Sequence, residues 1–277
     1  MFTCMSPGAI GIGLPWEECL PLAKAAGFDG IDVDVDPAKG AAYYRDALAR
    51  YGLQPGGAGL PFDYRGSASG VGEGLQKLDA IAAVAAEVGV TRFATWILPY
   101  SDELRMAENL RFHVERLAPA AKILDAHGCR LGLEFIGPKT MREGHKYVFV
   151  HTLEQMLAMG ELIGPNVGLL LDSWHWYTSL GTVEDILALD QRQVVYVHIN
   201  DAPAGVPVDR QLDAVRCLPG ATGVEDLPGF LHALRTIGYD GPVVPEPFVP
   251  ELREMPPAQA AQTVADALRG VWTTTSV

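Results

Sequence analysis

The sequence lacks several features that would place it in a common class of protein. Its four cysteines, Cys4, Cys19, Cys129 and Cys217, lie far apart and form no Cys-x-x-Cys pair. Structural zinc spacing is therefore absent, and a reducing compartment is expected. No apolar stretch approaches the roughly 20 residues that span a bilayer, and no basic segment followed by an apolar one marks a secretion signal at the N-terminus. We expect a cytoplasmic protein without a membrane partner.

The chain is also poor in basic charge. It has 21 Lys and Arg residues against 34 Asp and Glu residues, which gives a formal net charge of −13. Because contacts to phosphate backbones need a basic face, we expect no nucleic-acid partner. Low-complexity segments and Ser/Gly linkers are absent as well, so residues 1–277 are expected to form a single domain.

A pattern of amphipathic helix, glycine and apolar strand recurs along the chain. Gly27, Gly89, Gly128 and Gly238 each follow a helical pattern and precede an apolar run. Glycine ends a helix in the left-handed conformation at little cost. Repeated alternation of helix and strand predicts a parallel sheet with right-handed crossovers.

The pattern predicts eight strands and eight helices. The strands are expected near 8–12, 30–35, 55–60, 92–98, 130–134, 167–172, 194–199 and 242–246, and the helices near 16–26, 40–51, 72–88, 102–127, 152–163, 182–189, 226–237 and 257–271. This count favours an α/β fold of the closed (β/α)8 TIM barrel type. A doubly wound open sheet is the alternative, but no Gly-x-Gly-x-x-Gly follows the first predicted strand.

Side chains suited to metal binding end four consecutive predicted strands. Each follows an apolar run that is typical of a buried parallel strand. A charged group at such a position costs free energy unless it is paired. Active sites of barrels lie at the C-terminal ends of the strands. Because strands five to eight are adjacent around the rim, the residues at their ends could all bind one divalent cation. The four residues are Glu134, Asp172, His198 and Glu246.

On these residues, the chain resembles the xylose isomerase-like barrels, a broad group of sugar and sugar-phosphate isomerases and epimerases. The resemblance covers essentially the whole chain. It rests on Glu134, Asp172-Ser173-Trp174-His175, His198-Ile199-Asn200-Asp201, Arg216-Cys217-Leu218-Pro219-Gly220 and Glu246. It implies one divalent metal ion, commonly manganese, magnesium, cobalt or zinc, held by Glu134, Asp172, His198 and Glu246. A small carbohydrate is the implied substrate.

The resemblance also implies two substrate contacts, His175 and Arg216. The family's usual Gly-Glu-Gly is here Gly220-Ala221-Thr222-Gly223, without the Glu, so Arg210 remains a second candidate for the role of Arg216. Two further substrate-binding residues are predicted from the pattern alone. Lys139 lies in the long loop 136–145 after strand five, where barrels often carry lids. Asp34 lies on strand two, on the same face as Asp32 and near the rim, where it could bind a sugar hydroxyl.

The residue types suit carbon-acid chemistry. One imidazole and three carboxylates form a hard site that favours manganese or magnesium, with cobalt and zinc as alternatives. A Lewis acid at this site lowers the pKa of the C–H group beside the carbonyl of a hydroxy-ketone, and it stabilises the enediolate that forms when the proton leaves. Glu134 and Glu246, on non-neighbouring strands, are the predicted acid/base pair, because one can remove a proton and the other return it. This predicts a metal-dependent sugar or sugar-phosphate isomerase or epimerase.

Three alternatives follow from the same residues. A dehydratase or lyase acting on a keto-sugar, a keto-cyclitol or a 3-keto-glycoside shares the enolate step. A DNA-repair endonuclease needs a three-metal cluster and a basic surface, and strands three and four supply no histidine. A non-catalytic sugar-binding or partner subunit is opposed only by the intact ligand set. A homo-oligomer is compatible with the sequence, which does not set the oligomeric state.

Overall fold

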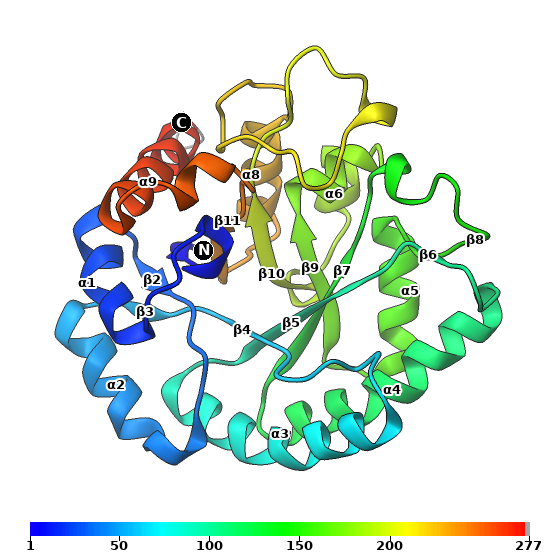
Figure 1. Ribbon diagram of the computed structural model, residues 1–277, viewed down its shortest axis with the longest axis horizontal. Helices are drawn as coiled ribbons and strands as arrows, with labels where there is room; N and C mark the ends of the chain where they lie inside the picture. Colours follow the sequence, from blue (N-terminus) through cyan, green and yellow to red (C-terminus); the bar gives the residue numbers. More distant parts are fainter. Residues whose placement is uncertain (275–277) are drawn as a thin grey trace.

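The computed structural model describes residues 1–274 and contains one closed barrel (Figure 1). Its main sheet has nine segments in the order β3-β2-β1-β11-β10-β9-β7-β5-β4. The two segments at the ends of this order, β3 (Gln54–Pro55) and β4 (Ala58–Gly59), are halves of one interrupted strand. The first half pairs with β2 (Gly30–Ile31) and the second with β5 (Arg92–Ile97). The sheet therefore closes through residues 54–59 into eight strands, which confirms the TIM barrel.

The other barrel strands all pair in parallel with their neighbours. They are β1 (Phe2–Met5), β7 (Arg130–Phe135), β9 (Val167–Asp172), β10 (Val194–Ile199) and β11 (Pro242–Pro245). A separate antiparallel pair joins β6 (Tyr100–Ser101) and β8 (Tyr147–Val148).

Helices surround the barrel and alternate with its strands (Figure 1). They are α1 (Trp16–Ala26), α2 (Gly40–Tyr51), α3 (Ala68–Val88), α4 (Met106–Ala126), α5 (Leu153–Ile163), α7 (Val183–Leu187), α8 (Leu227–Thr236) and α9 (Pro257–Thr274). A short extra helix, α6 (Ser173–Thr178), follows β9 directly. Within residues 1–274, no helix is both long and apolar enough to cross a membrane.

The position of the first strand is the one clear error among the predicted elements. A strand was expected at 8–12, whereas the first strand is β1 and residues Gly8–Ile10 form a 3-10 helix, η1. The segment is apolar, but it follows Pro7, and Gly11 adopts the left-handed conformation with φ of 79°. A residue in the left-handed region does not continue a strand. This apolar run therefore forms a turn instead of a strand.

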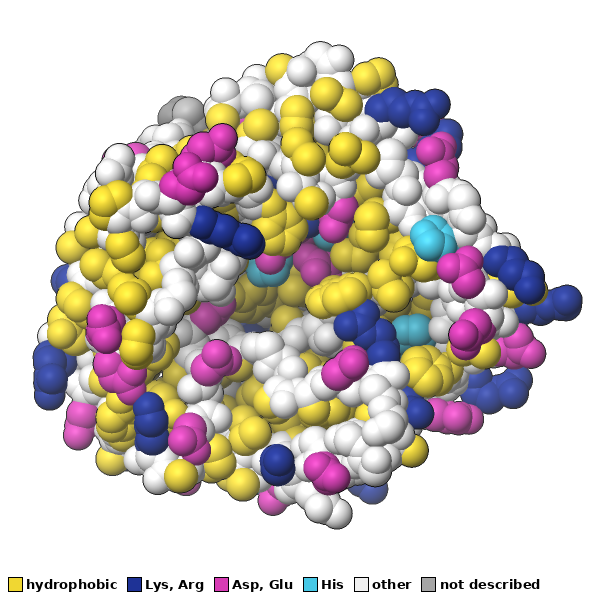
Figure 2. Space-filling model, viewed as in Figure 1, with side chains coloured by type: hydrophobic (Ala, Val, Ile, Leu, Met, Phe, Trp, Pro, Cys, Tyr) yellow, Lys and Arg dark blue, Asp and Glu magenta, His cyan; other side chains and the backbone are white. Residues whose placement is uncertain are grey.

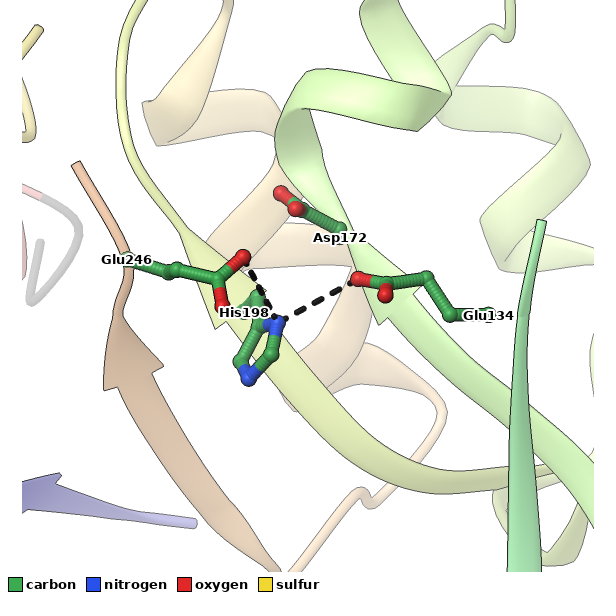
Figure 3. A group of neighbouring side chains, drawn as sticks. All are labelled: Glu134, Asp172, His198 and Glu246. Atoms are coloured by element: carbon green, nitrogen blue, oxygen red, sulfur yellow. Dashed lines mark hydrogen bonds and ion pairs between the residues drawn. The ribbon is translucent and has the colours of Figure 1, made fainter. Parts of the chain in front are cut away.

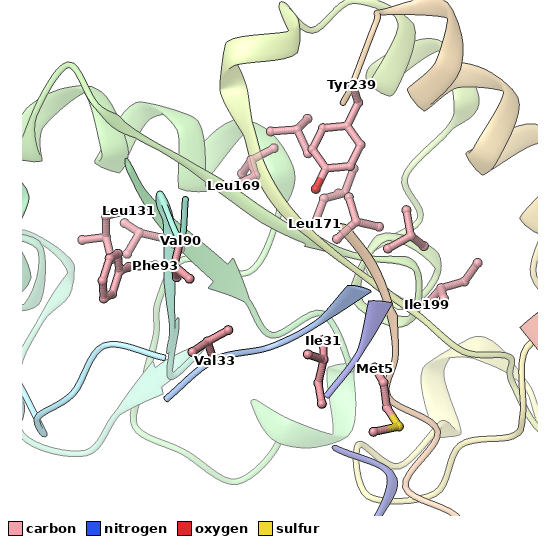
Figure 4. Close-up of a cluster of buried hydrophobic side chains, with 14 of the residues drawn as sticks. Met5, Ile31, Val33, Val90, Phe93, Leu131, Leu169, Leu171, Ile199 and Tyr239 are labelled. Carbon is pink, nitrogen blue, oxygen red and sulfur yellow. The ribbon is translucent and has the colours of Figure 1, made fainter. Parts of the chain in front are cut away.

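The barrel strands separate two layers of apolar side chains, because successive residues point to opposite faces. Leu169 and Leu171 belong to the large cluster that packs between strands and helices (Figure 4). Leu170 points the other way and packs inside the barrel with Cys4, Tyr196 and Val244. Fully burying one such side chain contributes about 1.5–3 kcal/mol. The alternation that places Leu170 inside also carries the strand-end residues of β9, β10 and β11 inward.

Candidate metal centre

The four strand-end residues converge at the C-terminal mouth of the barrel (Figure 3). Glu134 and His198 lie near the ends of β7 and β10, Asp172 is the last residue of β9, and Glu246 follows β11. Each offers one ligand atom, and these atoms all lie within 4.8 Å of one another. The structure thus brings together all four predicted ligands.

The arrangement fits one small divalent cation. His198 Nδ1 lies 3.3 Å from Glu134 Oε1 and 3.4 Å from Glu246 Oε2. Figure 3 shows the two carboxylates approaching this nitrogen from two different directions, Glu246 from the left and Glu134 from the right of the view. Ligands about 2.0–2.2 Å from one ion are at most about 4.4 Å apart, so a contraction of about half an ångström completes the coordination. The donors, three carboxylates and one imidazole, suit a cation that prefers oxygen and nitrogen.

Burial and neighbouring charges shift the pKa values of the ionisable groups in this cluster. Burial raises the pKa of Glu134 to about 7, even though His198 opposes the shift. Burial also acts to raise the pKa of Glu246, but the positive charges of His198 and Arg216 outweigh it and hold that pKa below its usual value. For His198, burial lowers the pKa, and the neighbouring Glu246 and Glu134 outweigh this and raise it. Burial and the neighbouring positive charges therefore act against each other on both glutamates.

Arg216 lies behind the ligand set and neutralises part of its charge. The residue is 5% exposed, and Nη1 donates to Asp172 Oδ2 at 2.7 Å and to Glu246 Oε2 at 3.1 Å. Nη2 donates to Asp213 Oδ1 at 3.1 Å. The alternative residue, Arg210, is exposed and lies 3.6 Å from Glu143. Arg216 is thus the arginine at the centre, and its contact with substrate remains a prediction.

His175 is buried beside the same carboxylates. Gly137 N donates to His175 Nδ1 at 3.2 Å, so the neutral ring carries its proton on Nε2. That nitrogen lies 3.8 Å from Asp172 Oδ2 and 3.9 Å from Glu134 Oε1. Burial lowers the pKa of His175 to about 3, which keeps the ring neutral. The 3.4 Å contact with Arg216 Nη2 then joins two donors and is not a hydrogen bond.

Asn200 and Asp201 hold Asp172 and the neighbouring loop in place. Asn200 Nδ2 and Trp174 N both donate to Asp172 Oδ1 at 2.9 Å, which leaves Oδ2 to face the other ligands. Asp201 is fully buried and accepts four backbone N–H groups, from Ala202, Thr222, Gly223 and Glu225. It therefore holds the loop that carries Arg216 against the strand that carries His198.

A cavity of about 320 Å³ adjoins the ligand set, at the small end of the range for small-molecule sites. Glu134, His198 and Glu246 form part of its wall, and Trp96 also lines it. Trp96 is 41% exposed, and the Arg65 guanidinium carbon lies 3.9 Å from the centre of its ring. Figure 2 shows a hollow at the centre of this face, in which acidic and histidine side chains lie among hydrophobic ones.

Two predicted substrate-binding residues are not brought to this cavity. Lys139 Nζ lies 3.0 Å from Asp209 Oδ2, between the exposed loops that follow β7 and β10. Asp34 is exposed and lines two neighbouring cavities. The side chains of these two residues do not face the ligand set in this arrangement, and their contact with substrate remains a prediction.

The sequence reasoning missed three residues that line the cavity: Asp32, Tyr196 and Phe248. Alternation could have identified the first two, because Asp32 lies between the outward-facing Ile31 and Val33, and Tyr196 precedes His198 by two residues. Phe248 has a positive φ of 47° and lies under the Arg216 guanidinium at 4.3 Å. We find no sequence signal for that conformation.

A model of the xylose isomerase-like TIM barrel family matches residues 20–271. The chain belongs to this family. Inosose isomerase of Bacillus subtilis (strain 168) is 31% identical over 151 residues, which are 54% of this chain and 51% of that protein. The 3-dehydroshikimate dehydratase of Pseudomonas putida is 30% identical over 152 residues, which are 54% of this chain and 23% of that protein. The chain spans about half the length, or less, of these curated relatives.

Solved structures share the fold over the whole chain. A xylose isomerase domain protein from Alicyclobacillus acidocaldarius subsp. acidocaldarius is 28% identical, with a TM-score of 0.85 and complete coverage of both chains. The crystal structure of IolI protein, which carries a zinc atom, is 22% identical, with a TM-score of 0.80 and complete coverage of both chains. The proteins that this chain is similar to thus include an isomerase and a dehydratase.

Proposed function

We propose that this protein is a divalent-metal-dependent carbohydrate isomerase or epimerase that removes a proton from the carbon beside a ketone. One observation carries the proposal: the ligand atoms of three carboxylates and one imidazole lie within 4.8 Å of one another beside a cavity of about 320 Å³. The similarity to inosose isomerase supports an enzyme of this class. Manganese is the favoured ion because the site is rich in carboxylates, and the zinc of the IolI structure supports a divalent ion in general.

Glu134, Asp172, His198 and Glu246 would hold the ion. When bound, it would polarise the substrate carbonyl and stabilise the negative charge that develops on its oxygen. One of Glu134 and Glu246 accepts the proton at a carboxylate oxygen. The other approaches His198 from a different direction and carries the proton for the opposite face of the substrate (Figure 3). Return to the same carbon gives epimerisation, and return to the neighbouring carbon gives isomerisation.

His175 and Arg216 complete the proposed centre. The Nε2 proton of His175 faces the Asp172 and Glu134 carboxylates and helps to orient them. Arg216 bridges Asp172 and Glu246, so it orients both carboxylates and supplies a fixed positive charge. Both residues act at the edge of the ligand set that lies away from the open cavity.

A dehydratase is the second candidate, and the similarity to 3-dehydroshikimate dehydratase favours it specifically. Proton removal beside the ketone is common to both reactions. In the dehydratase, the next step expels a leaving group from the neighbouring carbon, whereas in the isomerase the proton returns. The product mass separates them, since isomers conserve mass and a dehydratase product has lost water.

Deuterium incorporation from D2O tests the proposal directly. Manganese-loaded protein is incubated with free ketoses, ketose phosphates, 2-keto-myo-inositol, 3-dehydroshikimate and 3-keto-glycosides, and the products are followed by mass spectrometry. We expect exchange on at least one compound, and a loss of about 100-fold or more in Glu246→Gln. Glu251→Gln, the same substitution at an exposed position nearby, is the matched control. Equal exchange in wild type and Glu246→Gln would refute the assignment.

A further inference from the structure

Asp32 is an acidic residue in the cavity wall that belongs to no part of the proposed metal centre. It follows β2 on the inward face, and its Oδ2 accepts a hydrogen bond from Tyr196 Oη at 2.5 Å. The Tyr196 ring packs edge-on against the His198 ring, with 5.4 Å between the ring centres. One aromatic ring therefore connects Asp32 to the ligand set, and both border the same cavity.

The carboxylate of Asp32 is held in one orientation. Its Oδ1 accepts Gly57 N at 2.8 Å and lies 3.7 Å from Cys4 Sγ. Gly57 is required there, since a Cβ would lie 2.4 Å from the Tyr196 ring. An ionised carboxylate can accept about four hydrogen bonds, and besides the weak thiol contact this one accepts three, from Tyr196, Gly57 and the Ser6 side chain. Because Asp32 lines the cavity, a substrate hydroxyl can donate to the acceptor position that remains.

The side chains described around Asp32 include no lysine or arginine that could pair with an anion. A second cavity of about 350 Å³ adjoins the first and shares Ser6, Gly8, Asp32, Ala58 and Gly59 with it. Among the described residues that line the two, none is Lys or Arg, and the second cavity adds another acid, Asp34. Phosphate groups are recognised by arginine, lysine or free helix N-termini. The adjoining helix α6 is no such site, because Asp172 already accepts its Trp174 N–H.

Two arginines beside the first cavity are held by other groups. Arg216 is paired with Asp172 and Glu246, and the Phe248 ring lies 4.3 Å from its guanidinium carbon. Arg65 lies over the ring of Trp96, and its Nε is 3.3 Å from Asp63 Oδ1. An anionic substituent beside Asp32 would therefore meet its carboxylate without a lysine or arginine side chain to offset the repulsion.

We propose that Asp32 is a specificity-determining residue that selects an uncharged polyhydroxylated ketone, either a free ketose or a keto-cyclitol. It accepts a hydrogen bond from a hydroxyl of the substrate, and its charge disfavours phosphate esters and carboxylates. This inference rests on the proposed function, because it assigns the substrate class of the same site. It separates the free-sugar chemistry from the sugar-phosphate chemistry that the ligand set alone leaves open.

Matched pairs of compounds test the inference. Binding to manganese-loaded protein is measured by calorimetry for D-fructose and D-fructose 6-phosphate, and for 2-keto-myo-inositol and 3-dehydroshikimate, and the same compounds are assayed for exchange in D2O. We expect the uncharged member to bind at least about tenfold more tightly. Asp32→Asn is expected to weaken binding of the uncharged compound about tenfold. It should also reduce the difference in affinity between the uncharged and the charged compound of each pair, because the neutral amide no longer repels an anion.

Two further variants make the result specific. Tyr196→Phe keeps the charge of Asp32 but removes the hydroxyl that orients it, so affinity should fall while the preference for uncharged compounds remains. Asp46→Asn removes the same charge from the exposed face of α2 and should leave the ratio of affinities unchanged. Thermal unfolding of each variant establishes that it is folded before binding is compared.

The outcomes distinguish this inference from the proposed function. Charged compounds that bind as tightly as uncharged ones, unchanged binding in Asp32→Asn, or no binding by any uncharged compound would each overturn the role of Asp32. Exchange confined to D-fructose 6-phosphate would also overturn it while leaving the proposed chemistry in place. Selective binding of uncharged ketones without exchange would support Asp32 and refute the isomerase instead.

Discussion

At the scale of single residues, Asp201 shows how a buried carboxylate organises the loop beside the metal centre. Four backbone N–H groups donate to it, and its removal would leave them without partners in the interior. We expect Asp201→Ala to lower the free energy of unfolding by about 2–4 kcal/mol, as for other buried charged partners. Urea unfolding measures the change. Asp209→Ala, at an exposed ion pair, should stay within about 0.5 kcal/mol of wild type.

Asn200 provides a test of the ligand geometry that does not alter a ligand. Its amide donates to Asp172 Oδ1, so Asn200→Ala leaves that carboxylate one hydrogen bond short. The hydrogen bonds from Trp174 N and Arg216 remain, so the carboxylate is less firmly oriented rather than released. We expect manganese affinity to fall by about 10–100-fold, the usual effect of removing a group that orients a metal ligand. Calorimetric titration with manganese measures it, and unchanged affinity would mean that Trp174 N and Arg216 suffice to orient Asp172.

The convergence of Glu134, Asp172, His198 and Glu246 could be predicted from sequence because each ends an apolar run. Asp32 was missed because the sequence analysis chose Asp34, which lies two residues further along on the same face. The strand β2 ends at Ile31, before either acid. The roles of Asp201 and Phe248 depend on a loop and on a backbone angle that no local pattern encodes. Residue types at strand ends were therefore predictable, whereas partners across loops were not.

At the scale of elements, the interrupted third strand closes the barrel beside the proposed substrate cavity. A Cβ at Gly57 would lie 2.4 Å from the Tyr196 ring and 2.9 Å from the Arg92 carbonyl oxygen. We expect Gly57→Ala to destabilise the protein by about 1–3 kcal/mol, because these atoms must shift. The matched substitution Gly59→Ala meets no atom within 4 Å and should be nearly neutral. Thermal unfolding of the two variants compares them, and equal effects would contradict this packing.

Most elements were predictable because helix and strand periods differ and glycines separate them. The first strand was misplaced because Gly8–Ile12 is as apolar as a strand, and only the left-handed Gly11 shows that it turns. The break at Gly56–Gly57 is likewise set by tertiary packing, since Asp32 and Tyr196 come from other strands. Local pattern therefore gave the number of strands more reliably than their ends.

At the scale of the whole molecule, buried neutral histidines make stability depend on pH. His113, on α4, is buried and bonds through Nδ1 to Asn109 O at 2.8 Å, and burial lowers its pKa. The unfolded chain therefore binds more protons than the folded one below about pH 6.5, the usual histidine value. Its contribution to stability is present above that pH and is lost as the pH falls toward the lower, folded-state pKa.

Urea unfolding between pH 8 and pH 5 measures this effect. Wild type should lose stability as the pH falls, and His113→Gln should show a shallower slope in this range, because its side chain does not titrate. An identical slope in the two proteins would mean that other groups account for the dependence. The variant also loses ring packing against Phe149, so the slopes are compared rather than the absolute stabilities.

The central claim is that strands β7, β9, β10 and β11 deliver four ligands to one ion at the mouth of the barrel. Anomalous diffraction from crystals grown with manganese tests it most directly. We predict a single strong peak bonded to Glu134, Asp172, His198 and Glu246 at about 2.0–2.4 Å. Manganese bound elsewhere, with His198 Nδ1 still paired only with the two glutamates, would contradict the claim.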